Sequence, residues 1–531
     1  MRDVVRDSYF GHLVRLVYRP HYLRYAEEED GFVIPKFDQA MIGEAKDDPR
    51  ESIHTDSLPS VRGVDLHLVT WYGPRDNENP RNWTLGKKCY VTFLIMILTT
   101  TVYIGSAIYS PAVGEASEYF GVSTTVGSLG ISLFVAGYGV GPLFLSGPTE
   151  VPAIGRTSIY IITLFIFFIL NILTALVTNF SGFCILRFLA GFMGSPALAT
   201  AGASLDDMFP AHKLAYSMGF WGLAAEAAPA MAPIISGFVV EHHGWRWAFW
   251  EMVIMSGFSL IILFFTLPET SPDTILLRRA QRIRQKNGNL HFQSQSEITH
   301  AALSYRQIIV DSLLRPIALT CTEPIIIAIN LYTGLVYATL YSFFESFPLV
   351  YEQGYGWSLG TSTLPFAALF VGSFTGWVIY CYWNWRWVDQ PHDPSAPRPL
   401  PETRLPTAFI GAFCFPTCVL WFAWTAIRCH WIAPVLSGIP FGMGSTLIFN
   451  PFLTYLPYAY PQYAASALAS NDFFRSMMGA GMPIAAHPLF GNLGVAWGNT
   501  IIGLLSVAMI PIPFVLYRAG PWLRKKSKIA L

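Results

Sequence analysis

Residues 159–177 read IYIITLFIFFILNILTALV, an uninterrupted apolar run as long as a helix that crosses a bilayer. The chain holds twelve such runs of roughly 17 to 25 residues, six on each side of a polar stretch from about Pro268 to Ser312. They begin near Val91, Val126, Ile159, Phe183, Ala215, Phe249, Ile317, Leu364, Ala408, Ile432, Ala464 and Ile501. The pattern predicts an all-α membrane protein with twelve transmembrane helices in two six-helix bundles.

The composition supports a lipid-embedded chain and excludes several classes of function. Of 531 residues, 53% are hydrophobic and only 13% are charged, against about 25% charged in soluble domains. The 34 basic and 34 acidic residues cancel, so no basic field exists to bind nucleic acid. The sequence has no glycine-rich phosphate loop, and its seven cysteines lack metal-ligand spacing. We therefore expect no metal and no cofactor.

The distribution of Lys and Arg predicts the orientation in the membrane. Basic residues gather in alternate loops and in the carboxyl-terminal LRKKSK, whereas the other loops hold only Arg246 and Arg428. Because cytoplasmic loops are enriched in Lys and Arg, both termini are expected in the cytoplasm. The predicted units are a cytoplasmic amino-terminal tail (1–88), an amino-terminal bundle (89–267), a cytoplasmic central loop (268–314), a carboxyl-terminal bundle (315–518) and a basic tail (519–531).

Two polar segments have amphipathic patterns. In residues 1–20, apolar positions can share one helical face flanked by arginines, which predicts an interfacial helix on anionic lipid, with a disordered tail as the alternative. The central loop carries TILLRRAQRIRQK, which predicts a membrane-surface helix, with a solvated charge run as the alternative.

A few ionisable residues interrupt the apolar runs, namely Arg187, Glu226, Glu323, Asp472 and Arg475. Charges inside a membrane cost about 3 kcal/mol or more, so they persist where they line a cavity or form pairs. A buried carboxylate can take up and release a proton near neutral pH, and a neighbouring Arg tunes it. Of these residues, Arg187, Glu226, Asp472 and Arg475 are candidates for proton coupling; fixed ion pairs between helices are the alternative.

Several motifs together resemble one family, the major facilitator superfamily, and within it the fungal twelve-span drug:proton antiporters. The loop GPLFLSGPTEVPAIGR, the fourth span with Arg187, and the fifth span GFWGLAAEAAPAMAPIISGF carry the resemblance, along with NPRNW, WRW and LPET. The chain departs from the family pattern at Glu150, where Asp is usual, and at Ala232, where Gly is usual. The resemblance assigns a cytoplasmic gate motif to Gly141, Glu150, Gly155 and Arg156, and an antiporter motif to Gly222, Pro229, Pro233 and Gly237.

The resemblance also implies roles for buried residues. Arg187 would help to set the protonation of a cavity carboxylate, for which Glu226 is our own candidate. Aromatic side chains of the seventh span would form a wall for flat hydrophobic substrates. The residues predicted to line the substrate cavity are Glu323, Tyr332, Tyr337, Tyr341, Glu345 and Asn471.

The predicted function is proton-coupled efflux of small lipophilic molecules, such as drugs, fungicides or secondary-metabolite toxins, by alternating access. The alternatives are a proton-coupled nutrient symporter of the same fold and a transporter-derived sensor. An enzyme is not expected, because no nucleophile, metal cluster or paired acids are found at one interface. We expect a functional monomer in the plasma membrane, with the vacuolar membrane as the alternative.

Overall fold

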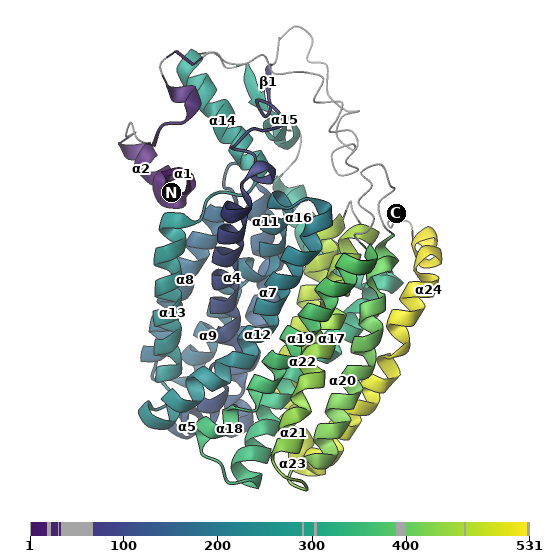
Figure 1. Ribbon diagram of the computed structural model, residues 1–531. Coiled ribbons are helices and arrows are strands. Elements are labelled where there is room, and N and C mark those ends of the chain that lie inside the picture. The colour runs from purple at the N-terminus through teal and green to yellow at the C-terminus, as the bar shows by residue number, and fades with distance from the viewer. Residues whose placement is uncertain are drawn as a thin grey trace.

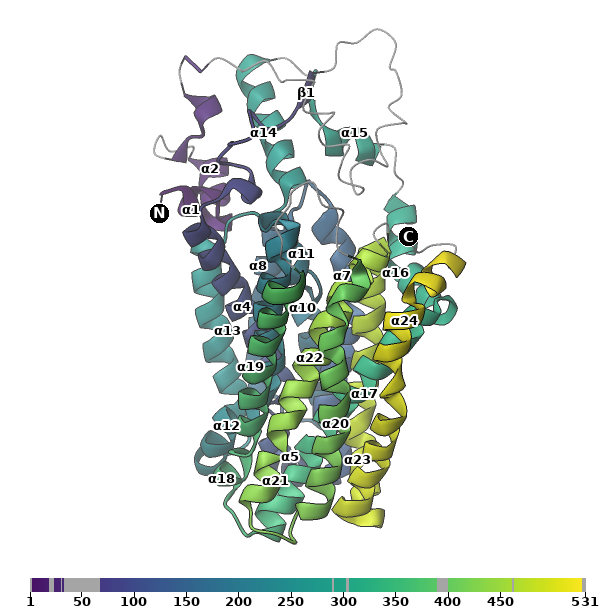
Figure 2. The same ribbon diagram turned by 45° about the vertical axis from the view of Figure 1, so that its right-hand side comes forward.

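The computed structural model of the protein describes residues 2–18, 23–29, 31–32, 67–288, 291–301, 305–388, 400–460 and 463–527. A large part of the predicted amino-terminal tail (33–66) and the end of the predicted basic tail (528–531) lie outside these ranges. Long helices dominate, and they form two bundles that stand side by side (Figures 1 and 2). Both chain ends lie at one end of the bundles (Figure 1), which we call the terminal face; the other end is the opposite face.

The first bundle contains six membrane-length segments, and short helices extend or connect them. Its long helices are α4 (Leu85–Ala107), α7 (Leu129–Glu150), α8 (Arg156–Leu176), α9 (Phe180–Gly194), α12 (Ala211–His243) and α13 (Trp247–Thr266). The short ones are η5 (Ser110–Ala112), α5 (Val113–Phe120), α6 (Thr124–Gly127), α10 (Pro196–Ala199) and α11 (Ala201–Met208).

The second bundle repeats this arrangement. Its long helices are α17 (Pro324–Phe347), α19 (Phe366–Trp383), α20 (Pro406–Thr425), α22 (Gly438–Ala459), α23 (Ala464–Met509) and α24 (Pro511–Lys526). The accompanying elements are α16 (Tyr305–Thr322), η6 (Pro348–Gly354), α18 (Leu359–Thr363), η7 (Asn384–Val388), η8 (Pro401–Arg404) and α21 (Ile432–Leu436).

Reciprocal glycine pairs set the spacing of equivalent helices in the two bundles. Gly137 of α7 and Gly191 of α9 each lie against a backbone carbonyl of the other helix, so a side chain at either would clash. Gly372 of α19 and Gly442 of α22 make the same contacts in the second bundle. Small residues allow membrane helices to approach closely, and their recurrence fits a duplicated six-span unit.

The chain reverses direction inside the segment Ala464–Lys526, which is 63 residues long. At Gly494 the backbone has φ 73° and ψ 166°, which breaks the helix. A side chain at Gly498 would meet the ring of Phe490. In a continuous helix these two residues would lie about 12 Å apart, so the chain must fold back between them. Eleven stretches of the described residues are long and apolar enough to cross a membrane. Because this last stretch crosses twice, the predicted twelve spans are confirmed.

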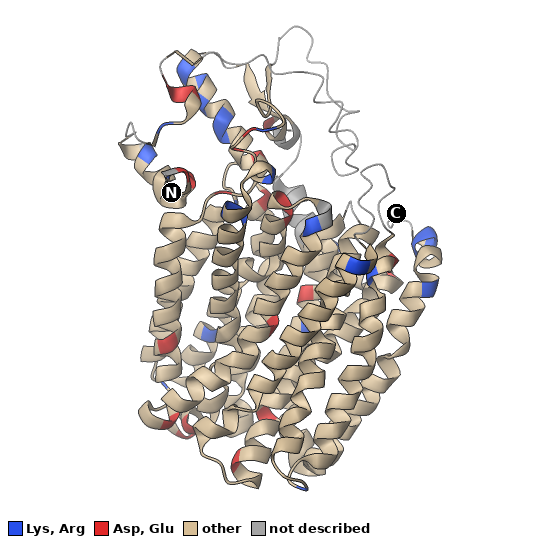
Figure 3. Ribbon diagram, viewed as in Figure 1, with Lys and Arg blue, Asp and Glu red and all other residues tan. Residues whose placement is uncertain are grey.

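A small unit at the terminal face combines the amino-terminal segment with the loop between the bundles. It contains α1 (Arg2–Asp7), α2 (Tyr9–Val17), η2 (Ala26–Glu28), β1 (His67–Val69), η4 (Pro80–Asn82), α14 (Pro272–Asn287), β2 (Phe292–Ser294) and α15 (Gln295–Ala301). Strands β1 and β2 pair in parallel, with His67 opposite Phe292. Figure 3 shows many charged residues in this unit, whereas the bundles below it are nearly free of charge.

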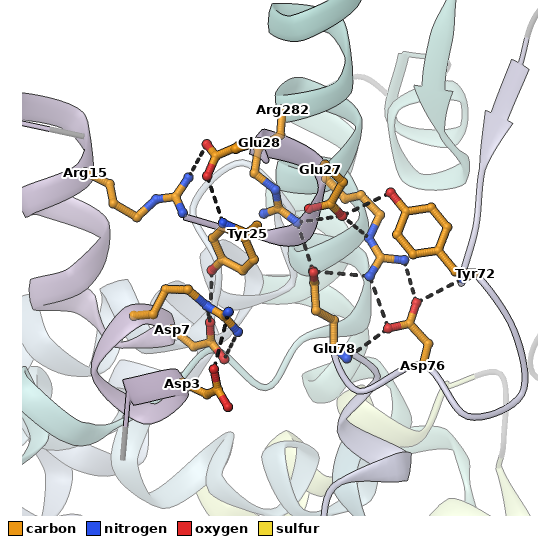
Figure 4. Close-up of polar contacts among 12 residues, drawn as sticks. Asp3, Asp7, Arg15, Tyr25, Glu27, Glu28, Tyr72, Asp76, Glu78 and Arg282 are labelled. Atoms are coloured by element: carbon orange, nitrogen blue, oxygen red, sulfur yellow. Dashed lines mark hydrogen bonds and ion pairs between the residues drawn. The ribbon is translucent and has the colours of Figure 1, made fainter. Parts of the chain in front are cut away.

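Buried ion pairs hold the two parts of this unit together (Figure 4). Arg279 of α14 is 0% exposed, and its guanidinium lies 2.6 Å from Asp76, 3.1 Å from Glu27 and 3.3 Å from Glu78. Arg282 adds a pair with Glu78 at 2.9 Å. Three carboxylates of the amino-terminal segment therefore depend on two arginines of the central loop.

These contacts correct one expectation. Residues 274–286 are helical, as the pattern predicted, but they do not form a membrane-surface helix. Ala280 and Ile283 pack with Val69 and Phe292 inside the terminal-face unit. The apolar face of α14 is thus covered by protein, and its spacing alone could not distinguish a protein partner from lipid.

Replacing Arg279 with Ala is expected to open the terminal-face unit while leaving the bundles folded. Three buried carboxylates would lose a partner, and breaking a buried ion pair costs about 3 kcal/mol or more. Hydrogen exchange in residues 67–82 should accelerate roughly a hundredfold. Arg284→Ala is the matched control, because Arg284 pairs with Glu297 near the surface and should change exchange little. Equal effects of the two substitutions would contradict this account.

The same unit is expected to loosen in acid. Burial acts to raise the pKa of Asp76, but hydrogen bonds and charge from Arg279, with the N–H groups of Tyr72 and Glu78, hold it below its ordinary value. The stability that Asp76 contributes is complete above its unfolded-state pKa of about 3.9. It is lost as pH falls further through the folded-state pKa. Exchange in residues 67–82, corrected for its intrinsic pH dependence, should rise below about pH 4, and Asp76→Asn should weaken this response.

Candidate functional site

A cavity lies between the two bundles, with an empty volume of about 670 Å³, its open mouth included. Helices α4 and α12 form one wall, and α17, α19, α22 and α23 form the other. The lining residues are Tyr103, Trp221, Gly222, Ala225, Glu226, Pro229, Ala230, Val336, Tyr337, Leu340, Leu369, Ser373, Phe441, Gly442, Ser445, Phe449, Asn450, Leu453 and Arg475.

Glu226 is the acidic residue of this lining. Its carboxylate accepts a hydrogen bond from the Thr446 hydroxyl at 2.5 Å, and Thr446 lies on α22 of the second bundle. Ser373 and Ser445 line the cavity as well. No ion pair involves Glu226 within the described part of the chain. One carboxylate of the first bundle is thus held by a neutral donor of the second, at the bundle interface.

Arg475 is the basic residue of the lining and comes from the opposite wall. It pairs with Asp472, one turn earlier on α23, and donates to the Tyr103 hydroxyl of the first bundle at 3.1 Å. Its guanidinium also lies 5.0 Å from the ring centroid of Tyr337. Asp472 is buried and does not line the cavity. This position is the one expected of a fixed ion-pair partner. The two charged groups of the cavity are therefore unlike: Arg475 is neutralised and Glu226 is not.

Tyrosines join the bundles beside this cavity. The Tyr138 hydroxyl of α7 lies 2.6 Å from that of Tyr337 and 3.0 Å from that of Tyr341 on α17. Of the three predicted seventh-span tyrosines, Tyr337 lines the cavity and Tyr341 extends the network behind it. Tyr332 instead packs edge-on against Phe452 inside the second bundle.

Three other residues predicted for the cavity lie outside its lining. Glu323 precedes α17 and accepts a hydrogen bond from Tyr460 at 2.9 Å. Glu345, near the other end of α17, accepts from Ser128 of the first bundle at 2.8 Å. Asn471 donates to Asn330 and Thr333 within the second bundle.

Arg187 is fully buried inside the first bundle and does not reach the cavity. Its guanidinium donates to the carbonyl oxygens of Gly130 and Gly105, both at 2.8 Å. It also lies 4.4 Å from the ring centroid of Phe134. No carboxylate pairs with Arg187 among the described residues. The contacts favour a structural role, in which Arg187 joins α9 to α7 and α4.

Three of the four residues of the predicted gate motif, Glu150, Gly155 and Arg156, lie at the terminal face of the first bundle. Gly141 packs against Ser195, Glu150 ends α7, and Gly155 precedes α8 with φ 78°. Arg156 forms an ion pair with Asp207 at 3.2 Å. Glu150, Gly155, Arg156 and this acidic partner lie in one region of a single bundle, whereas Gly141 lies nine residues, about 13 Å, deeper along α7.

Glu269 is a polar residue of this region that the motif analysis did not assign. Its carboxylate is 3% exposed and accepts from the N–H groups of Arg156 and Thr157 at the start of α8. A carboxylate at a helix N-terminus satisfies free N–H groups and favours the helix dipole. Glu269 is the acidic residue of the LPET motif, so this motif could have indicated the residue that caps the N-terminus of α8.

The antiporter motif faces the cavity in part. Gly222 and Pro229 line it, and a side chain at Gly222 would approach the Asn450 amide of α22 to 2.7 Å. Gly237 lies against Thr363 of α18. Helix α12 continues through Pro229 and Pro233 from Ala211 to His243. The motif thus gives α12 a small-residue face against the second bundle.

Several lining residues, including Tyr103, Trp221 and Asn450, were not predicted from the sequence. Trp221 donates its indole N–H to Thr99 at 3.0 Å, which fixes the ring against α4. Apolar residues surround each of these positions in the sequence, and periodicity does not distinguish a cavity face from a packed one.

The fold and the cavity define a twelve-span membrane transporter of two bundles with a central site. Residues 95–483 match the Major Facilitator Superfamily, and the chain belongs to that family. It is 40% identical over 489 residues to Transporter mfs1 of Schizosaccharomyces pombe, covering 91% of this chain and 92% of that protein. It is 35% identical over 557 residues to the Cycloheximide resistance protein of Candida maltosa, covering all of both chains.

The fold recurs in a solved transporter of low sequence identity. The proton:xylose symporter XylE from E. coli superposes with a TM-score of 0.56 at 14% identity, over 82% of this chain and 96% of the other. At this identity the similarity concerns the fold alone.

Arg187→Ala is expected to lower the thermal stability of the purified protein. The carbonyls of Gly105 and Gly130 would lose their donor in a buried site, at a cost of about 1–3 kcal/mol each. Arg246→Ala is the control: Arg246 is only partly buried at the opposite face, lies over the rings of Tyr119 and Trp245, and donates one long bond, 3.3 Å, to Val177, so its loss should cost less. Unchanged melting of the Arg187 variant would show that these bonds do not stabilise the bundle.

Proposed function

We propose that this protein exports lipophilic organic molecules in exchange for protons, by alternating access around the central cavity. The observation that supports this most is Glu226, a carboxylate without an ion-pair partner among the described residues, hydrogen-bonded across the bundle interface to Thr446. It lies in a cavity that residues of both bundles line.

The lining indicates the class of substrate. Trp221, Tyr337, Phe441 and Phe449 present aromatic surface, which binds flat hydrophobic molecules over a large area. The full-length relative from Candida maltosa is named for resistance to cycloheximide. We infer lipophilic drugs, fungicides or secondary-metabolite toxins as substrates.

The Glu226 carboxylate supplies a way to couple protons to movement. When ionised, it accepts a charge-assisted hydrogen bond from Thr446, which is stronger than a neutral one. Protonation removes that charge, weakens the bond and favours separation of α12 from α22. Deprotonation restores both the bond and a negative charge in the cavity. Arg475 stays paired with Asp472 throughout and keeps its side of the cavity neutral.

The remaining assignments follow from charge. The terminal face carries most of the Lys and Arg, so we place it, with both termini, in the cytoplasm. We further propose that one chain suffices for transport, because both walls of the cavity come from a single chain. The plasma membrane is the proposed location, with the vacuolar membrane as the alternative.

Proton flux in vesicles tests the proposal. The purified protein is reconstituted, a pH gradient is imposed, and lipophilic drugs including cycloheximide are added while internal pH is followed. We expect drug-dependent proton release with the unaltered protein and none with Glu226→Gln, which keeps the size of the side chain but cannot ionise. Glu251→Gln is the matched control, because Glu251 lies on membrane helix α13 outside the cavity lining.

Two outcomes would overturn the proposal in different ways. Drug-coupled proton flux that survives Glu226→Gln would leave export in place and reject Glu226 as the proton carrier. Flux driven only by sugars or other nutrients, in the same direction as the proton, would show a symporter.

A further inference from the structure

The outer surface of α13 carries an apolar stripe that faces away from the bundle. Ile254, Phe258, Ile261 and Phe265 follow one another at helical spacing and are 42–64% exposed. In a membrane protein such a face contacts lipid. This stripe reaches the terminal end of α13, where Leu267 and Pro268 end the span.

Helix α2 begins where this stripe ends. Ser8 caps α2 and pairs with Pro268, and the N–H of Glu269 donates to the carbonyl of Asp7 at 3.2 Å. The Phe10 ring lies 4.8 Å from the ring of Phe265, centroid to centroid. Figures 1 and 2 both place α1 and α2 beside the terminal end of α13. The amino-terminal helices are thus fixed at the edge of the lipid-facing surface.

The apolar stripe continues along α2. Phe10, Leu13 and Val17 share one face of the helix at spacings of three and four residues. Leu13 is 38% exposed, Val17 74%, and the following Tyr18 82%. These side chains extend the lipid-facing stripe of α13 outward from the bundle, at the level where the membrane ends.

The charged side chains described in α1 and α2 interact with other protein groups and not with the apolar stripe. Arg15 donates to Glu28 and to the Leu23 carbonyl, both at 2.7 Å. Arg6 pairs with Asp7 at 2.9 Å. Burial, with the positive charges of Arg278 and Arg15, lowers the pKa of His12 to about 4, so His12 is neutral at physiological pH. Little free positive charge therefore remains on the described part of α2.

We propose that α2 is a membrane-surface helix whose partner is the lipid bilayer itself, with Phe10, Leu13, Val17 and Tyr18 seated at the boundary of acyl chains and headgroups. Apolar burial drives this contact rather than attraction to anionic headgroups. The helix anchors the terminal-face unit to the membrane beside α13. The inference does not depend on which substrate is carried.

Lipid-borne quenchers test this placement in the full-length protein. The exposed Cys89, Cys321 and Cys429 are replaced with Ser, and an environment-sensitive fluorophore is attached at Val17→Cys or, separately, at Leu13→Cys. The protein is reconstituted in phosphatidylcholine vesicles that contain headgroup-proximal nitroxide lipids. Phe265→Cys provides the lipid-facing reference. Asn287→Cys, at the distal end of α14, provides the aqueous control.

We expect both α2 labels to be quenched by the lipid nitroxide as strongly as the Phe265 label, and the Asn287 label to be unaffected. The quenching should persist in 0.5 M salt, where the Debye screening length is about 4 Å, and should not need anionic lipid. Quenching that salt abolishes would overturn the apolar seating. Labels on α2 that behave like the Asn287 label would overturn the placement. So would labels shielded from both lipid nitroxide and aqueous iodide, because a protein partner would then cover the helix.

Discussion

The absence of water inside a bilayer is the constraint on which this structure depends. Every backbone N–H and C=O in the membrane must find a partner within the protein, so the chain crosses as helices. The chain changes direction where its backbone groups can find other polar partners. One such change is the break at Gly494. At the start of α8, the Glu269 carboxylate accepts a hydrogen bond from a free backbone N–H group. The same constraint makes each charge inside the bundles costly, and the placement of the few present follows from how that cost is met.

Three arrangements of internal charge result. Arg187 is surrounded by carbonyl oxygens and aromatic rings, which stabilise a cation without a counter-ion. Asp472 and Arg475 neutralise each other. Glu226 has a hydroxyl partner instead of a cation, as Glu345 has in Ser128, but of these two carboxylates Glu226 is the one that lines the cavity. A group whose ionised form is held only by a neutral donor at a movable interface is suited to respond to a proton. The other two arrangements favour constant charge.

The sequence was sufficient for the fold because hydrophobic length and charge placement report directly on membrane crossing. It also identified Glu226, Arg475 and Tyr337, since ionisable and aromatic residues stand out in an apolar run. It misplaced Glu323, Glu345 and Asn471, because depth along a helix and the facing neighbour decide whether a residue reaches a cavity. Tyr103 and Asn450 were missed for the same reason. The apolar spacing of α14 was recognised, but its protein partner, strand β1, lies some 200 residues earlier in the chain.

The terminal-face unit has consequences for how the bundles can move. Its contacts with the membrane region include the end of α13, where Ser8 meets Pro268, Asp7 meets Glu269 and Phe10 meets Phe264 and Phe265, and the start of α4, where Lys87 pairs with Asp7. The pairs of Arg279 and Arg282 then join the amino-terminal segment to α14. Glu269 links this junction to α8, beside the Arg156–Asp207 pair. Because these contacts lie on the first bundle, the proposed rocking of the second bundle would leave intact the buried ion pairs that Arg279 and Arg282 form in the described part of the unit.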